Sequence, residues 1–106
     1  MEEPNLSFIE NLSNGDKAFE EKIFKVIRRE FPEEKEKYFV SINSKKYKKA
    51  AEDVHKLKHK ISILGLKTSY DTAEKYEDNL KSASETLREE FESILQNITT
   101  YLQNTL

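Results

Sequence analysis

The feature of this 106-residue chain that most constrains its fold is an apolar pattern between residues 47 and 64. Apolar side chains recur there at spacings of three and four throughout: Tyr47, Ala50, Val54, Leu57, Ile61 and Leu64. That spacing lines up side chains on one face of an α-helix, whereas a half-buried strand needs strict alternation. Gly65 follows the last of them and suits a helix C-terminus. We therefore predict a helix whose apolar face lies in a core.

Upstream of this pattern, the sequence predicts two further helices. Asn14-Gly15 marks a turn, and Asp16 is suited to cap the helix that follows it. The apolar residues within 16–42 recur mostly at three and four, which predicts one long helix bent near Pro32. Before the turn, the apolar residues between Leu6 and Leu12 predict a short N-terminal helix.

Downstream, two more helices complete the expected fold. After a turn at 41–44 and the central helix, a fourth helix is expected to begin near Ser69, and a last one spans the apolar residues of 87–102. Ser82 and Glu85 have the spacing of a capping box for the last helix. Short connections favour antiparallel neighbours, so we predict an all-α, up-down antiparallel four-helix bundle with a short N-terminal helix.

Composition narrows the class of protein. A chain of this length is expected to form a single domain over residues 1–106. Cysteine is absent, which excludes disulfides and thiolate sites. The net charge of −2 predicts no bulk attraction to nucleic acid or membrane, and no apolar run approaches the roughly 18 residues of a membrane span. The acidic N-terminus is unlike a signal peptide, and we expect a cytoplasmic protein.

The only two histidines, His55 and His59, lie four residues apart on the central helix. On a helical wheel they fall off the apolar stripe, and Lys58 lies between the stripe and their flank. Three interpretations compete. The histidines are solvated side chains, or they share a metal ion, or His55 is a nucleophile that accepts a phosphoryl group. Metal binding is the weakest of these, because three lysines surround the pair and a lysine follows His55.

The residues from His55 to Gly65 resemble the signature of histidine-containing phosphotransfer (HPt) domains, which is roughly H-x-L-K-G-x₅-G. His55 matches the phosphorylated histidine, Leu57 the buried position, Lys58 the phosphate-facing lysine and Gly65 the closing glycine. The family commonly has Leu-Glu a little over twenty residues later, where this chain has Tyr76-Glu77. The helix order and the N-terminal segment extend the resemblance over nearly the whole chain.

One departure from the family pattern bears on the site. His59 stands where the family usually has glycine, and a glycine leaves the face open to a docking partner. His59 has three expected outcomes: it turns aside, it donates to the phosphate when protonated, or it blocks docking.

The resemblance implies a phosphoryl carrier in a multistep phosphorelay. His55 would take the group from the aspartyl phosphate of a receiver domain and pass it to another receiver. Glu77 is the expected carboxylate for the Nδ1 of His55, and Lys58 the expected cation for the phosphoryl oxygens. Such a domain needs no cofactor or metal of its own, because the receiver brings Mg²⁺, and it has no ATP site.

The expected partners are therefore receiver domains and a hybrid sensor histidine kinase, and the expected state is a monomer. Residues 45–60 hold seven lysines and two acidic residues, a local charge of +5 that suits the acidic pocket of a receiver. Phe8 or Ile9 could add apolar docking contacts. The alternative is a non-catalytic helical bundle that binds a receiver or kinase without transferring phosphate.

Overall fold

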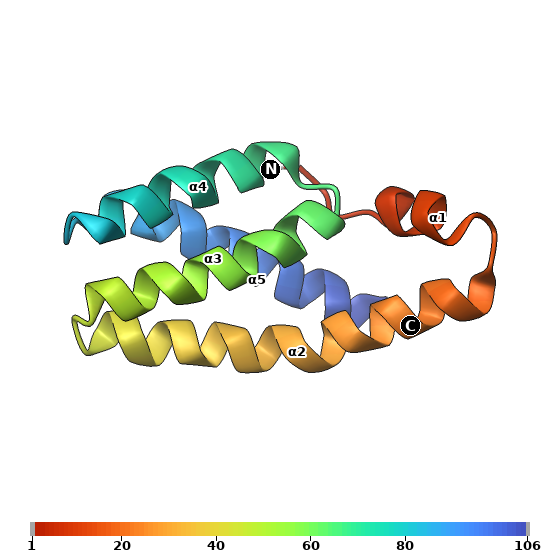
Figure 1. Cartoon of the computed structure of the whole chain (residues 1–106), viewed down its shortest axis with the longest axis horizontal. Helices are drawn as coiled ribbons and strands as arrows, with labels where there is room; N and C mark the ends of the chain where they lie inside the picture. The colour runs from red at the N-terminus through yellow and green to blue at the C-terminus, as the bar shows by residue number, and fades with distance from the viewer. Residues whose placement is uncertain (1, 106) are drawn as a thin grey trace.

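The computed structural model describes residues 2–105, and in that range the chain is helical and contains no strand. Five helices follow one another along the chain (Figure 1): α1 Ser7–Ser13, α2 Lys17–Asn43, α3 Tyr47–Ile63, α4 Lys67–Lys81 and α5 Arg88–Asn104. The expectation of an all-α chain with a short N-terminal helix is confirmed.

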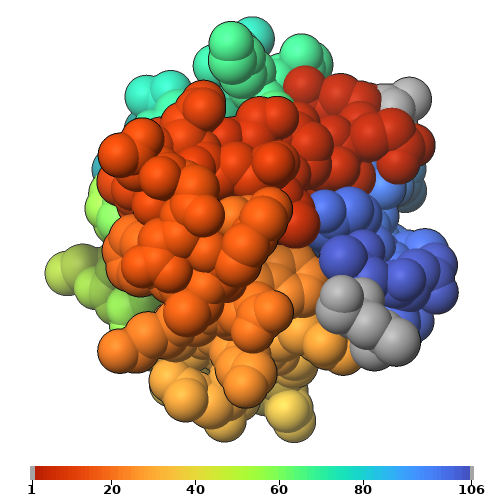
Figure 2. Space-filling view, turned by 90° about the vertical axis from the view of Figure 1, so that its right-hand side faces the viewer, coloured from red at the N-terminus to blue at the C-terminus, as the bar shows by residue number. Residues whose placement is uncertain are grey.

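The four longer helices lie along the 43 Å axis of the molecule, which measures 23 × 20 Å across. Helix α3 packs against both α2 and α4, and α5 packs against α4 and α2. Helix α1 contacts α2, and Figure 2 shows α1 and the start of α2 covering one end of the molecule. This arrangement places the middle of α3 beside α4, away from the end that α1 covers.

Helix α2 begins as the sequence predicts, but it ends later. Asp16 caps it, because its Oδ1 accepts a hydrogen bond of 3.2 Å from the backbone N–H of Phe19. Pro32 lies inside the helix and does not end it. The predicted turn at 41–44 is displaced, because Ser41 and Ile42 are buried and remain helical to Asn43. The chain turns after Asn43, where Lys45 has a positive φ of 58°.

Two other predicted helix ends need correction. Helix α4 starts two residues before Ser69, and the carboxylate of Glu2 accepts from the N–H of Ser69. The predicted capping box at 82–85 is wrong. Ser82 is the C-cap of α4 instead, and the Glu85 carboxylate binds Lys45, in the connection between α2 and α3, and Tyr47, the first residue of α3. Both regions contain a side-chain contact between residues distant in sequence.

The core contains the apolar stripe of α3 and side chains from every other helix. Its largest fully buried members are Tyr38, Tyr76, Phe31, Phe91, Ile9, Ile27, Ile42, Leu57, Ile61, Leu64, Leu66 and Leu80. Ile9 is therefore a core residue rather than a docking residue, because only 1% of its surface is exposed. Phe8, its neighbour on α1, is half exposed.

Candidate functional site

His55 lies near the middle of α3 on its outer side. The side chain is 53% exposed, whereas the flanking stripe residues Val54 and Leu57 are fully buried. The helical wheel therefore assigned His55 to the correct side of the helix. An imidazole this exposed, on a helix that packs against α2 and α4, is accessible to a partner.

A carboxylate from the neighbouring helix holds one nitrogen of this ring. The Oε2 and Oε1 atoms of Glu77, on α4, lie 3.2 and 3.4 Å from Nδ1 of His55. Glu77 is buried, with only 8% of its side chain exposed. An ionised carboxylate can only accept hydrogen bonds, so Nδ1 carries the proton and Nε2 keeps its lone pair. The tautomer that a nucleophilic Nε2 requires is thus favoured by α4.

Lys58 completes a triad with the exposed His55 and the buried Glu77. Its Nζ lies 3.0 Å from Oε1 of Glu77 and 5.4 Å from the ring centre of Tyr70, and its side chain is only 10% exposed. Burial alone would lower the pKa of Lys58, but the hydrogen bond and the charge of Glu77 raise it above its ordinary value. Lys58 is therefore a charged side chain directed toward Glu77.

The pKa of Glu77 results from opposing effects. Burial raises this pKa, but the hydrogen bond and charge of Lys58, followed by those of His55, lower it below its ordinary value. The Nζ of Lys81, one turn along α4, lies 3.4 Å from Oε2 of Glu77. With three cationic or donor groups around it, Glu77 is ionised at neutral pH and keeps its hydrogen bond to His55.

His59 lies one turn beyond His55 on the same exposed flank. The two ring centres are 5.0 Å apart, and the ring planes meet at 70°, an edge-to-face arrangement. His59 is exposed, so its side chain has room to turn. The structure thus brings together all four residues that the sequence predicted for the site, with His59 beside the ring rather than remote from it.

An open groove between α3 and α4 runs beside His55. His55 and Glu77 line it together with Lys48, Lys56 and Lys81, and with the small Ala51 and the acidic Glu52. Lys81 is not among the residues predicted for the site, although its position four residues after Glu77 places it on the same face of α4. A groove with three lysine side chains favours an anionic partner.

Within residues 2–105, no group of three or more His, Cys, Asp or Glu residues is placed to hold a metal ion. No helix in that part of the chain has the length and apolar character needed to cross a membrane. Comparisons with protein-family models, with curated proteins and with solved structures gave no match. Support for a function therefore comes from the geometry around His55.

Proposed function

We propose that this protein is a histidine phosphotransfer protein, which accepts a phosphoryl group on Nε2 of His55 from a receiver aspartyl phosphate and passes it to another receiver. The observation that carries the proposal is the contact between the exposed His55 and the buried Glu77, 3.2 Å from Nδ1. A structural histidine on a wet helix face needs no buried carboxylate behind it, and burying a carboxylate is costly unless it is paired.

We also infer that α2 to α5 form an up-down antiparallel four-helix bundle, the fold that this function implies. The short connections after α2 and α3 support it, as do the contacts of α3 with α2 and α4 and of α5 with α4 and α2. In such a bundle, an exposed histidine in the middle of one helix is accessible while a neighbouring helix supplies its carboxylate.

The transfer step follows from the tautomer. The lone pair of Nε2 attacks the phosphorus in line, and the N–P bond forms as the bond from phosphorus to the aspartate oxygen breaks. The aspartate leaves as a carboxylate, and its receiver supplies the Mg²⁺ that neutralises the phosphoryl oxygens. The proton stays on Nδ1, where Glu77 offsets the positive charge that develops on the ring. Transfer to a second receiver is the same step in reverse.

Lys58 and the groove lysines supply the remaining electrostatic stabilisation. Lys58 is 3.0 Å from Glu77, so it keeps that carboxylate ionised and adds positive charge behind the ring. The groove that His55 lines also holds Lys48, Lys56 and Lys81, which suits the acidic pocket of a receiver. A hybrid sensor kinase that carries such a receiver is the expected source of phosphate in the cytoplasm.

The direct test is to mix the full chain with a receiver that carries a radiolabelled aspartyl phosphate. We expect label on the protein that is stable to alkali and labile to acid, which is the behaviour of phosphohistidine. His55→Gln should remove the label while circular dichroism shows an intact helical fold. Label retained by His55→Gln would refute the site.

His59 decides between the carrier and its alternative, a bundle that binds a receiver without transferring phosphate. The bulk of a second imidazole, 5.0 Å from the first, is the observation that favours this alternative. If wild type binds a receiver without accepting label and His59→Gly accepts it, the protein is a non-transferring interaction module. Equal transfer rates for wild type and His59→Gly with several receivers would mean that His59 merely turns aside.

A further inference from the structure

The two exposed histidines also have the spacing of a metal-binding pair. Their ring centres are 5.0 Å apart. Two imidazoles that bind one Zn²⁺ at a tetrahedral angle, through bonds of about 2.0–2.1 Å, have ring centres about 5 Å apart. Because His59 is exposed, its side chain has room to rotate toward a metal ion bound by His55.

The contact with Glu77 favours the tautomer of His55 that can bind a metal ion through Nε2, which is also the tautomer that can attack a phosphoryl group. Histidines that bind metals commonly donate their other ring N–H to a carboxylate, which fixes the tautomer and makes the ligand nitrogen more basic. The contact between Nδ1 of His55 and Oε2 of Glu77, at 3.2 Å, provides that arrangement. In the tautomer that this contact favours, the lone pair that can bind zinc is on Nε2 of His55.

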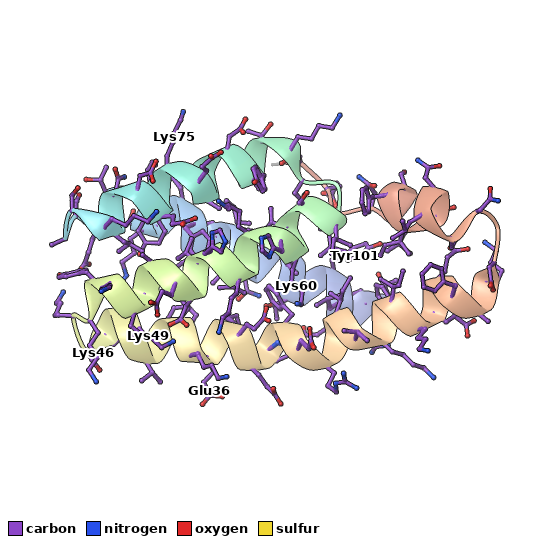
Figure 3. The ribbon with its side chains drawn as sticks, viewed as in Figure 1. Glu36, Lys46, Lys49, Lys60, Lys75 and Tyr101 are labelled. Atoms are coloured by element: carbon purple, nitrogen blue, oxygen red, sulfur yellow. The ribbon has the colours of Figure 1, made fainter. Side chains whose placement is uncertain are left out.

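The structure also weakens the charge argument against a metal. The sequence surrounds the pair with lysines, but the Nζ of Lys58 lies 3.0 Å from Glu77. The Nζ of Lys60 lies 3.0 Å from Glu30 and 3.3 Å from Glu34, both on α2, and Figure 3 shows Lys60 on the side of α3 that faces α2. Of Lys56, Lys58 and Lys60, the last two are thus paired with carboxylates, which lowers their repulsion of a cation. The lysines that still oppose a cation are those of the groove beside His55, namely Lys48, Lys56 and Lys81.

We propose that His55 and His59 together bind one divalent transition metal ion with the ligand preference of zinc, with Nε2 of His55 as one ligand. No cluster of three or more such ligands occurs in residues 2–105, so water completes the coordination. A site with two protein ligands is open and exchangeable, unlike a closed structural zinc site.

Metal binding at this site would affect phosphoryl transfer, a consequence that rests on the proposed function. A metal ion on Nε2 occupies the lone pair that must attack phosphorus, so metal and phosphoryl group exclude each other. Zinc would then act as a reversible inhibitor of transfer, and His59 would be the residue that makes His55 sensitive to it.

Binding is tested by calorimetric titration of the full chain with zinc chloride at pH 7.5. We expect one ion per chain, with a dissociation constant below about 100 μM. His55→Gln and His59→Gln should each weaken binding by at least about tenfold. Lys56→Gln is the matched control, because it changes an exposed side chain between the two histidines without removing a ligand, and it should bind at least as tightly as wild type.

A second readout assigns the ligands. The nitrogen resonances of both imidazoles should shift on addition of zinc chloride, with the largest change at Nε2 of His55. The proposal is overturned by the absence of saturable binding below about 100 μM, or by binding that survives either histidine substitution.

Competition is tested by measuring transfer from a labelled receiver without and with zinc chloride at ten times its dissociation constant. Mass action predicts that the rate for wild type falls about tenfold. The rate for His59→Gln should change less than about twofold, and an equal loss in both proteins would place the zinc effect on the receiver and refute the competition. If His55 accepts no label even without zinc, the proposed function fails, while the titration still decides the metal site.

Discussion

At the residue scale, one buried carboxylate contacts donors from two helices. Glu77 lies 3.2 Å from Nδ1 of His55, 3.0 Å from Nζ of Lys58 and 3.4 Å from Nζ of Lys81. His55 and Lys58 come from α3, and Lys81 comes from the same helix as Glu77. This one side chain therefore couples the chemistry of the imidazole to the packing of α3 against α4.

Glu77→Gln is expected to impair both chemistry and stability. The amide can accept from Nδ1 or donate to it, so the tautomer of His55 is no longer set, and we expect the rate of phosphoryl transfer to fall at least about tenfold. The buried Lys58 loses its ionic partner, which should lower the free energy of unfolding by about 1–3 kcal/mol.

The measurements are single-turnover transfer from a labelled receiver and urea unfolding. Glu74→Gln, an exposed glutamate of the same helix, is the matched control and should leave both quantities close to wild type. A transfer rate in Glu77→Gln equal to that of wild type would remove Glu77 from the proposed site.

At the scale of the elements, two connections are joined by one acidic side chain. The carboxylate of Glu85, between α4 and α5, accepts from Nζ of Lys45 and from the hydroxyl of Tyr47, each at 2.8 Å. Arg88 donates to the same carboxylate at 2.9 Å. These hydrogen bonds lower the pKa of Glu85 to about 2. The contact joins the start of α3 to the start of α5 at one end of the molecule.

A lowered pKa makes this contact sensitive to acid. The unfolded chain binds a proton at Glu85 near its ordinary pKa, and the folded chain does so only near pH 2. The stabilisation from Glu85 is therefore complete above about pH 4.5 and is lost as the pH falls toward about 2.

The check is urea unfolding of wild type and Glu85→Gln across this range. The difference in the free energy of unfolding between the two proteins should shrink as the pH falls, whereas the exposed Glu89→Gln should give no comparable trend. A difference that stays constant from pH 5 to pH 2 would contradict the assignment.

The turn between α3 and α4 depends on Gly65, which has φ +77°. A Cβ added there would lie 2.5 Å from Nδ2 of Asn5, which belongs to the N-terminal segment crossing this turn. Gly15 has a similar φ of +87°, but a Cβ there would meet nothing within 4 Å. Substitution of Gly15 therefore tests the effect of backbone conformation alone on stability, whereas substitution of Gly65 adds the effect of a steric contact.

Gly15→Ala should cost about 1–2 kcal/mol in the free energy of unfolding, from the positive φ alone. Gly65→Ala should cost more, because Asn5 must also move. Adding Asn5→Ala should recover part of that excess for Gly65→Ala and none for Gly15→Ala. Equal costs at the two glycines in thermal or urea unfolding would show that Asn5 does not constrain the turn.

At the scale of the whole molecule, a buried polar network crosses the core. The hydroxyls of Tyr38 on α2 and Tyr76 on α4 are 2.7 Å apart, and Tyr38 donates to Glu92 on α5 at 2.9 Å. Both tyrosine side chains pack against the ring of Phe91. Side chains from three helices therefore form one hydrogen-bonded network. This network specifies the relative positions of the helices and also contributes to stability.

Tyr38→Phe is expected to lower the free energy of unfolding by about 1–3 kcal/mol, because the Tyr76 hydroxyl loses its partner in a buried site. The double variant with Tyr76→Phe should cost less than the sum of the two single changes, since the second hydroxyl is then absent. Urea unfolding of the four proteins measures this coupling, and strict additivity would refute a shared network.

The sequence by itself determined where the long helices lie and which side of α3 is exposed. The pattern from Tyr47 to Leu64 follows directly from helix geometry, so it assigned Leu57 to the core and His55 to the surface without knowledge of any partner. Asp16 was likewise predicted as an N-cap, because capping uses residues only three positions apart. Helix periodicity and N-capping depend only on residues a few positions apart, so the sequence alone is enough to predict them.

Only the tertiary structure decided the charges and contacts of the site. It placed the Glu77 carboxylate at Nδ1, paired Lys58 with that carboxylate and directed Lys60 to α2. It also paired Glu85 with Lys45 and Tyr47, instead of making Glu85 part of a helix cap. These outcomes depend on contacts between side chains far apart in sequence, and no spacing along one helix specifies them. The chain therefore specifies the exposed histidine locally, and the packing of α4 on α3 decides what that histidine can do.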